Sequence, residues 1–493
     1  MAYKNYVDGK WVDSVTGESF ESRNPAETSE VIATVPKSDR RDVDAAVQSA
    51  ARAFPGWRKL PAPRRGEILF RAAEIMVQRK EELASLMTRE MGKVIKEARG
   101  DVQEAIDMTY YMAGEGRRLF GQTVPSELPN KFAMSVRDPI GVIAAITPWN
   151  FPLAIPTWKV MPALIAGNTV VFKPASDTPI LAIKLVEILE EAGLPGGVLN
   201  MVTGPGSSTG MALVTHPGVQ LISFTGSRAS ANEVSIEGAH LGKRVSLESG
   251  GKNAIIVMDD ANLDLAVDGV IWSAFGTTGQ RCTACSRLIV QRGVADQLVS
   301  RIVERARALR LGSGHLPETD MGPLINESQL RRVGEYVEIA KSEGAKLLTG
   351  GQRATGGQCA NGYFFEPTVF VDVTPRMRIA QEEIFGPVLA VITVDSLEEA
   401  IQINNDTQYG LSSAIFTSDV NKAYVAIRDL STGLVYVNAG TIGAEVQLPF
   451  GGTRGTGNGH REAGQAALDI FSEWKSVFVD FSGKLQRAQI DNS

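Results

Sequence analysis

Between residues 140 and 260, short apolar segments alternate with helix-like segments, and no other feature of the chain constrains its fold as strongly. The apolar segments are GVIAAITP, NTVVFKP, GVLNMVTG, LISFTG and NAIIVMD. The helix-like segments include WKVMPALIAG and PILAIKLVEILEEAG, the second of which ends at Gly193. Strands that alternate with helices form βαβ units, so this pattern predicts a parallel sheet with helices on both faces.

The flanking regions predict further α/β structure. Residues 42–120 carry alanine and leucine at helical spacing, and residues 131–145 (KFAMSVRDPIGVIAA) are strand-like. A second α/β region begins near residue 260, with helices DQLVSRIVERARAL and ESQLRRVGEYVEIAKSEG and strands RLIVQ, VLAVITV, LSSAIFT and GLVYVN. The terminal segment EWKSVFVDF alternates apolar and polar residues, and we expect such a strand to pair with another element or another subunit.

Composition and charge exclude several classes of function. The formal net charge of -6 and the lack of a basic run argue against a nucleic-acid partner. The apolar runs fall far short of the ~20 residues that span a bilayer, so no membrane partner is expected. The first residues, MAYKNYVDGKWVDS, lack a signal-peptide pattern, and three cysteines do not form a disulfide framework. These features favour a cytoplasmic protein.

Cys282, in FGTTGQRCTACSR, is a candidate nucleophile. Neighbouring glycines allow a substrate to approach the backbone, and a reactive thiol needs a lowered pKa or a nearby base. Arg281 and Arg287 supply positive charge in the sequence around it. The alternatives are a buried small side chain, or a redox or half-zinc motif with Cys285. The histidines show no ligand spacing, so we expect no metal site.

Two further residues could serve a thiol nucleophile. Glu248, in SLESGGKNAIIV, is either a solvated turn residue or a desolvated general base that activates water. Asn150, in TPWNFPLAIP, is either an ordinary turn residue or a donor to a developing oxyanion.

The usual dinucleotide fingerprint GxGxxG is absent. Lys173 instead follows the strand NTVVF, a Gly-Pro-Gly turn ends at Gly206, and Phe224 begins FTGS, which continues through Gly226 and Ser227 into a helical stretch. A strand, a glycine and a helix in succession can present a helix N-terminus to phosphate, although each piece alone could be an ordinary turn.

Seven motifs together resemble the aldehyde dehydrogenase superfamily, in the order of its signatures and across nearly the whole chain: TPWNFP, FKPAS, SFTGS, LESGGKN, GQRC, EEIFGP and PFGG. The resemblance implies an α/β aldehyde dehydrogenase fold with three parts. These are a Rossmann-like cofactor-binding domain (1–120 and 141–250), an α/β catalytic domain (251–455) and a small oligomerisation element (121–140 and 465–493). It also implies a homodimer or homotetramer.

The resemblance assigns the chemistry to three residues. Cys282 attacks a small aldehyde, Asn150 and the backbone N–H of Cys282 hold the oxyanion, and Glu248 activates the water that hydrolyses the thioester. The CoA-acylating branch lacks this glutamate, so Glu248 favours release of a free acid. Glu462 matches a proton-relay glutamate, although the NGHREAG context carries an apparent extra residue.

The cofactor residues follow in the same way. Lys173 would bind the adenosine ribose and Glu383 the nicotinamide ribose, with Phe385 beside the nicotinamide. The resemblance adds to the cleft Trp149, Gly226 and Ser227. Many NAD-preferring members carry a glutamate where this chain has Ser176, so we expect NADP to be accepted as well as NAD, or preferred.

The substrate is less constrained. GQRCT, and the loop NAGTIGAEVQLPFGG with Glu445, resemble the α-ketoglutarate-semialdehyde and aminoadipate-semialdehyde branches. Arg281 could therefore pair with the distal carboxylate of a semialdehyde, or could be only structural. Alternatives are a simple aliphatic or aromatic aldehyde, a cofactor-independent cysteine esterase, or a non-catalytic protein with this fold.

Overall fold

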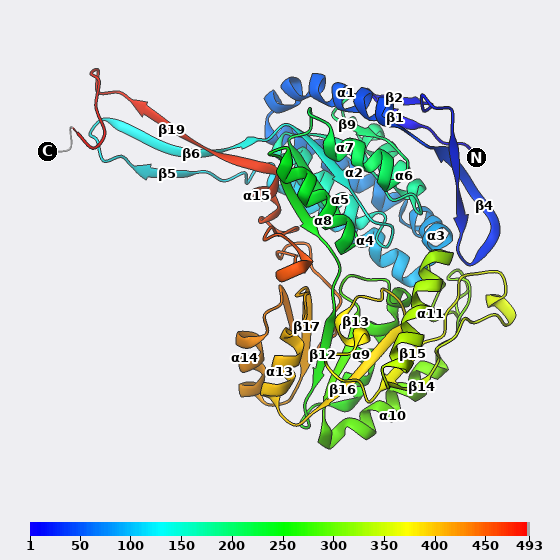
Figure 1. Ribbon diagram of the computed structural model, residues 1–493. Helices are drawn as coiled ribbons and strands as arrows, with labels where there is room; N and C mark the ends of the chain where they lie inside the picture. Colours follow the sequence, from blue (N-terminus) through cyan, green and yellow to red (C-terminus); the bar gives the residue numbers. More distant parts are fainter. Residues whose placement is uncertain (491–493) are drawn as a thin grey trace.

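A computed structural model describes residues 1–490, which form two large sheets, a three-stranded sheet and a hairpin (Figure 1). The first sheet has the order β11-β10-β7-β8-β9-β1-β2, in which β11 to β9 run parallel and β1 and β2 are antiparallel additions. Its strands are β1 (Asn5–Val7), β2 (Lys10–Val12), β7 (Val142–Ile146), β8 (Thr169–Lys173), β9 (Leu199–Met201), β10 (Leu221–Thr225) and β11 (Arg244–Glu248).

Helices cover both faces of the first sheet, because alternate side chains of its strands enter two separate cores. Ile143 and Val170 belong to one apolar cluster, whereas Ala144 and Val171 belong to the other. The helices around this sheet are α1 (Arg40–Lys59), α2 (Ala62–Gln78), α3 (Lys80–Met91), α4 (Ile95–Glu115), α5 (Ala154–Ala166), α6 (Pro179–Glu191), α7 (Met211–Thr215), α8 (Arg228–His240) and α15 (Ala467–Phe471).

The second sheet has the order β14-β15-β16-β13-β12-β17-β18 and is parallel except for β14. Its strands are β12 (Asn253–Val257), β13 (Cys285–Gln291), β14 (Lys346–Thr349), β15 (Thr368–Val371), β16 (Val388–Val394), β17 (Ser412–Phe416) and β18 (Leu434–Val437). Its helices are α9 (Leu263–Phe275), α10 (Arg292–Ala308), α11 (Glu327–Ser342), α12 (Arg378–Gln381), α13 (Leu397–Asn405) and α14 (Val420–Asp429).

A three-stranded antiparallel sheet extends from the body as an arm (Figure 1). Its central strand β6 (Lys131–Pro139) pairs with β5 (Gln122–Pro125) and with β19 (Ser472–Asp480), so the C-terminal strand is paired within its own chain. A separate hairpin joins β3 (Ser19–Asn24) to β4 (Glu27–Pro36). The predicted oligomerisation segment 465–493 includes 491–493, which lie outside the described residues.

The α/β prediction is confirmed by the two mostly parallel sheets, but the strand assignments need three corrections. The segment 131–145 is two strands in different sheets, separated at Gly141, whose φ is +141°. NAIIVMD forms β12, which pairs in the second sheet and not the first. The strand β11 was not predicted, because RVSLE lacks a continuous apolar run.

No helix within residues 1–490 is both long and apolar enough to cross a membrane.

Candidate active site

A cleft opens at the carboxyl ends of the first sheet. The chain leaves β7 for β8 on one side and later returns to β10 on the other, so the strand order reverses beside β7. Parallel sheets bind ligands at such a switch point. The predicted residues that line the cleft are Trp149, Asn150, Lys173, Ser176, Gly206, Phe224, Gly226, Ser227, Cys282, Glu383 and Phe385.

Lys173 and Ser176 follow β8 at one side of this cleft. Lys173 is buried, its Nζ donates a hydrogen bond to Pro174 O at 2.6 Å, and burial lowers its pKa to about 8 although the nearby Asp177 opposes this. Ser176 Oγ donates to Gly204 O at 3.0 Å. Lys173 Nζ can therefore donate a further hydrogen bond to an oxygen of a ligand, because the Pro174 carbonyl is its one acceptor among the described residues.

The turn from β10 to α8 presents polar groups to the cleft. Ser227 is the N-cap of α8 and accepts from the Ser230 N–H at 3.3 Å. Thr225 Oγ1 is buried without a hydrogen-bond partner among the described residues. At Gly226 a Cβ would lie 2.6 Å from the Phe224 ring, so a larger residue would disturb this wall. A helix N-terminus with this close backbone approach fits a polar or anionic ligand.

Glu383 and Phe385 close the opposite side. The Phe385 ring packs edge-on against Trp149 with centroids 5.4 Å apart, and its φ of +63° places the backbone in the left-handed region. Glu383 accepts a hydrogen bond from the Gly251 N–H at 2.8 Å. Gly250 has φ +61°, and a Cβ there would lie 2.4 Å from Glu383 Oε2, so a larger residue would strain the backbone and displace the Glu383 carboxylate.

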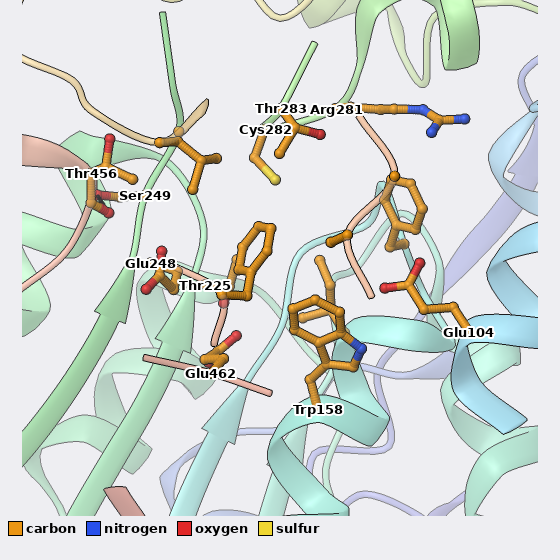
Figure 2. A pocket seen from close by; sticks show the side chains of 17 residues that line it. Glu104, Trp158, Thr225, Glu248, Ser249, Arg281, Cys282, Thr283, Thr456 and Glu462 are labelled. Carbon is orange, nitrogen blue, oxygen red and sulfur yellow. Dashed lines mark hydrogen bonds between the residues drawn. The ribbon is translucent and has the colours of Figure 1, made fainter. Parts of the chain in front are cut away.

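A second pocket adjoins the cleft and shares Cys282 with it (Figure 2). Its walls are largely apolar and include Phe151, Ile155, Trp158, Leu411 and Phe450. In Figure 2 the Cys282 sulfur points into this pocket, and Glu248 and Glu462 lie together on one side of it. Cys282 thus lies where the two spaces meet.

Cys282 lies between the 3-10 turn η2 (Gly276–Gly279) and β13, and it is partly exposed. Its carbonyl oxygen accepts a hydrogen bond from Asn253 Nδ2 at 2.7 Å, which fixes the loop. Burial raises the pKa of the thiol to about 12, and the carboxylates of Glu383 and Glu248 add to this rise. The surroundings therefore favour the neutral thiol over the thiolate, so a reaction at this sulfur would need a nearby base.

Asn150 follows β7 and is buried beside the Cys282 loop. Its Nδ2 donates to Gln280 O at 3.1 Å, which leaves a second amide hydrogen. The backbone N–H of Cys282 has no hydrogen-bond acceptor within residues 1–490. The two donors can thus serve one oxygen bound near the sulfur.

Glu248 ends β11 and is buried, with 4% of its surface exposed. Neither carboxylate oxygen has a hydrogen bond of ordinary geometry among the described residues, although the Gly452 backbone is close enough to lower the pKa slightly. Burial raises the pKa of Glu248 well above its usual value, and the charge of Glu462 raises it further. Such a carboxylate is suited to accept a proton near neutral pH.

Glu462 is brought next to Glu248 and forms a buried ion pair with Lys159. Lys159 Nζ also donates to Ser223 Oγ at 3.2 Å. Lys159 stabilises the ionised form of Glu248, because its charge lowers the pKa of that carboxyl. Glu248 thus interacts electrostatically with this buried pair, without a hydrogen bond to it among the described residues.

Of the two arginines near Cys282 in the sequence, neither presents a free charge to the thiol. Arg281 lines the pocket, but its guanidinium donates to Thr277 Oγ1 at 2.9 Å and pairs with Glu97 at 3.3 Å. In Figure 2 this guanidinium points away from Cys282. Arg287 is buried and donates to the backbone carbonyls of Lys252, Ile403 and Asn404. The positive charge that these two arginines supply is therefore directed at other groups.

Cys285 faces away from the pocket and is 1% exposed, with its Sγ 3.3 Å from Arg287 O. Cys282, Cys285 and Cys359 are all free thiols. Within the described residues no group of three or more His, Cys, Asp or Glu side chains could hold a metal ion.

Sequence reasoning missed part of the pocket. Glu104 on α4, Trp158 on α5 and Lys159 on α5 were not predicted as site residues. The spacing of α5 residues identifies a buried helix but does not show which side faces a pocket, and Glu104 resembles the other acidic residues of α4. Only the packing of α4 and α5 brings these side chains to the site.

Comparison with known proteins agrees with this geometry. A model described as the aldehyde dehydrogenase family matches residues 11–477. The alpha-ketoglutaric semialdehyde dehydrogenase of Bacillus subtilis is 44% identical over 477 residues, covering 97% of this chain and 98% of that protein. The alpha-ketoglutarate semialdehyde dehydrogenase of Haloferax volcanii is 47% identical over 479 residues, covering 97% and 99%. The crystal structure of betaine aldehyde dehydrogenase from Staphylococcus aureus in complex with NAD+ matches with a TM-score of 0.96 at 35% identity, covering 98% of this chain and 95% of that one.

Proposed function

The chain belongs to the aldehyde dehydrogenase family, and from that premise we propose that it oxidises a carboxylate-bearing semialdehyde to a dicarboxylic acid through Cys282. The observation that carries the mechanism is the position of Cys282 between two pockets, with Glu248 in one of them. The family assignment that the seven motifs suggested is confirmed, and with it the enzyme class.

We propose that Cys282 attacks the aldehyde carbon after losing its proton. Because the surroundings raise the pKa of the thiol, the proton must pass to a base as attack proceeds, and Glu248 is a nearby carboxylate whose pKa is also raised. The resulting thiohemiacetal oxygen is held by Asn150 Nδ2 and the backbone N–H of Cys282. Oxidation of this adduct leaves a thioester on the sulfur.

The same carboxylate serves the second half of the reaction. Once Glu248 has released the proton taken from the thiol, it takes a second proton from water, which hydrolyses the Cys282 thioester and frees the acid. We propose that Glu462, which pairs with Lys159 next to Glu248, receives each of these two protons in turn and passes it toward solvent.

The residues of the cleft fit a nicotinamide dinucleotide. The unpartnered Thr225 hydroxyl, the start of α8 and Gly250 leave room for polar and backbone contacts with such a ligand. When bound, the cofactor supplies the oxidant for the adduct. We propose that Lys173 holds the adenosine ribose and Glu383 the nicotinamide ribose, with Glu383 held in place by the Gly251 N–H.

We propose that both NAD and NADP are accepted. Ser176 is uncharged and its hydroxyl donates to Gly204 O, so it does not repel a 2′-phosphate. Asp177 also lines the cleft, but Asn326 Nδ2 donates to it at 2.9 Å and burial raises its pKa, so its charge is moderated. We expect kcat/KM values for the two cofactors within about tenfold of each other, and a hundredfold preference for NAD would contradict this proposal.

The substrate class rests on two supports. Two relatives at 44% and 47% identity are named for α-ketoglutarate semialdehyde. In addition, Arg281 and Glu104 give the largely apolar pocket a polar side (Figure 2). Since Arg281 already pairs with Glu97, it would contribute to binding through that ion pair and not as a free cation. A simple aliphatic or aromatic aldehyde is the second candidate, favoured by the apolar walls.

The test measures kcat/KM for a panel of aldehydes with both cofactors, using the absorbance of the reduced nicotinamide to record the rate. We expect semialdehydes to give kcat/KM values at least tenfold above those of unsubstituted aldehydes of equal length. Arg281→Ala separates the two roles of that residue. Equal losses on a semialdehyde and on an unsubstituted aldehyde would exclude carboxylate recognition by Arg281. Ester hydrolysis without any nicotinamide-dependent oxidation would instead favour a cysteine esterase.

We further propose a division of the chain by sheet. Residues 1–120 and 141–250, which contain the first sheet, bind the cofactor, and residues 251–455, which contain the second, carry the catalytic thiol. The arm formed by β5, β6 and β19 joins copies of the chain into a homodimer or homotetramer, since its exposed apolar side chains resemble an uncovered interface.

A further inference from the structure

Two polar groups in the aldehyde pocket have no partner. The walls of this pocket are mainly apolar, yet the Trp158 indole N–H is buried without a hydrogen-bond acceptor among the described residues. The Glu104 carboxyl also lines the pocket, and within residues 1–490 it makes no hydrogen bond and no ion pair. In Figure 2 the Glu104 carboxyl points into the pocket, and the indole nitrogen is on the side of the Trp158 ring toward Glu104.

The buried Trp158 N–H is costly to leave without an acceptor unless a ligand satisfies it, and the Glu104 carboxyl is likewise without a partner among the described residues. Neither group contributes to the chemistry assigned to Cys282 and Glu248. Their shared position at one side of the pocket indicates a subsite for the polar end of the substrate.

The charges around Glu104 are already matched in pairs. Lys93 Nζ, next to the start of α4, pairs with Asp101 Oδ2 at 2.8 Å, and both side chains are fully buried. The Arg281 guanidinium pairs with Glu97 on α4. An ionised Glu104 would therefore be the uncompensated charge of this cluster.

The remaining neighbours are acidic or neutral. Asp107, on the same helix, is exposed and accepts from Gln103 Nε2 at 2.8 Å. Tyr436 on β18 and the thiol of Cys282 are close enough to interact electrostatically with Glu104.

These surroundings favour the neutral acid. Burial raises the pKa of Glu104 to about 8, Asp101 and Asp107 add to the rise, and Arg281 and Lys93 oppose it. At neutral pH most of the enzyme then carries an O–H donor at this position. Above the pKa of Glu104 that donor becomes a carboxylate, which repels an anion.

We propose that Glu104 is a specificity-determining residue, whose neutral carboxyl group donates a hydrogen bond to the distal carboxylate of the substrate, with the Trp158 indole N–H as a second donor. This inference rests on the proposed semialdehyde oxidation and names the residues that bind the far end of that substrate. It makes recognition of the anion dependent on a proton held by the enzyme.

The test compares glutarate semialdehyde with pentanal, which differ at the distal end of the chain. The kcat/KM of each is measured from pH 7 to pH 9, and the ratio of anionic to neutral substrate is taken. Titration of Cys282 and Glu248 affects both substrates and cancels in this ratio. Because Glu104 loses its proton across this range, we expect the wild-type ratio to fall about tenfold, following its pKa of about 8.

Glu104→Gln keeps a donor at every pH, so its ratio should stay flat within twofold and exceed the wild-type ratio at pH 9. Trp158→Phe removes one donor and keeps the ring, and should lower the ratio about fivefold at all pH values. Asp107→Asn is the matched control on the same helix, and its ratio should follow that of the wild type. A variant that fails to fold loses activity on both substrates and does not change the ratio.

The proposal is overturned if the wild-type ratio is independent of pH or if the ratio for Glu104→Gln falls in parallel with it. It is also overturned if Glu104→Gln loses more than tenfold on 4-aminobutanal and nothing on glutarate semialdehyde, since Glu104 would then act as an anion for a cationic substrate. A wild-type ratio below one throughout would contradict the semialdehyde preference alone, because the response of the ratio to pH and to Glu104→Gln is read independently of its size.

Discussion

Cys282 and Cys285 are three residues apart, yet their surroundings give them different chemistry. Cys282 is partly exposed where two pockets meet, whereas Cys285 is buried in β13 with its sulfur against the Arg287 carbonyl. Both thiols have a pKa raised to about 12 by burial. Reactivity at this site therefore depends on access and on a neighbouring base more than on an acidic thiol.

This difference predicts the behaviour of two matched variants. Cys282→Ala should lower the kcat of aldehyde oxidation by at least about 10³-fold, because it removes the nucleophile. Cofactor binding should persist, and it can be measured by the quenching of tryptophan fluorescence. Cys285→Ala should keep kcat within threefold, with a loss of stability of about 1 kcal/mol from the small buried cavity. Equal inactivation by both substitutions would contradict the assignment.

The carboxylate pair predicts a pH effect. Glu248 acts as a base only when ionised, so the rate is lost as the pH falls through its pKa, which burial and Glu462 hold well above the usual value. Glu462→Gln removes the repulsion and leaves Lys159 beside Glu248, so the acid limb of the kcat profile should move to lower pH by about one unit. Glu473→Gln, at the exposed start of β19, is the control and should not move it. An acid limb that stays in place or moves to higher pH would rule out this coupling.

At the scale of elements, the crossing between the two sheets forms the centre of the site. β11 is at the edge of the first sheet and ends at Glu248, and β12 begins at Asn253 inside the second. The four residues between them, 249–252, therefore connect the two sheets. Gly250 lies in this crossing with φ +61°, directly against the Glu383 carboxylate.

Gly250→Ala should disturb this crossing. The added Cβ would lie 2.4 Å from Glu383 Oε2 in a backbone conformation that disfavours alanine, so Glu383 must shift. We expect the KM for the cofactor to rise about tenfold, with a loss of about 1–2 kcal/mol in the free energy of unfolding. Gly334→Ala in α11, where a Cβ meets open space, is the control and should not weaken cofactor binding. An unchanged cofactor KM in Gly250→Ala would contradict this steric role of Gly250.

Strands with a continuous apolar run could be predicted from the sequence. Strands and side chains whose positions depend on the neighbouring elements they pack against could not. The runs that became β7, β8 and β10 are continuous and apolar because helices cover both faces of their sheet. RVSLE has no such run, since β11 is an edge strand. The sequence of β12 does not indicate that this strand enters a different sheet from β11. The motif residues around Cys282 and Glu248 were predicted together, whereas Glu104 and Trp158 reach the pocket only through helix packing.

For the molecule as a whole, the arm is the feature that the rest of the chain covers least. β5, β6 and β19 extend from the body with little cover (Figure 1). The exposed fractions of Phe478 and Trp474 are 64% and 54%. A soluble chain rarely exposes such aromatic side chains in a row without a partner surface.

Phe478→Asp should therefore weaken assembly. A charge in an apolar interface is costly, so we expect the apparent mass by light scattering to fall toward that of one chain at micromolar concentration. Ile236→Asp, which changes an exposed apolar side chain of α8 on the body, should leave the mass unchanged. Retention of the wild-type mass by Phe478→Asp would show that the arm does not hold copies together.

The two spaces that meet at Cys282 have otherwise largely separate linings. An aldehyde can therefore occupy its own pocket while the spent cofactor is still in the cleft. The thiol would then be captured as an adduct that has no oxidant beside it, and turnover would wait for the cofactor to exchange. At high aldehyde concentration the enzyme should accordingly slow down, and added fresh cofactor should restore its speed.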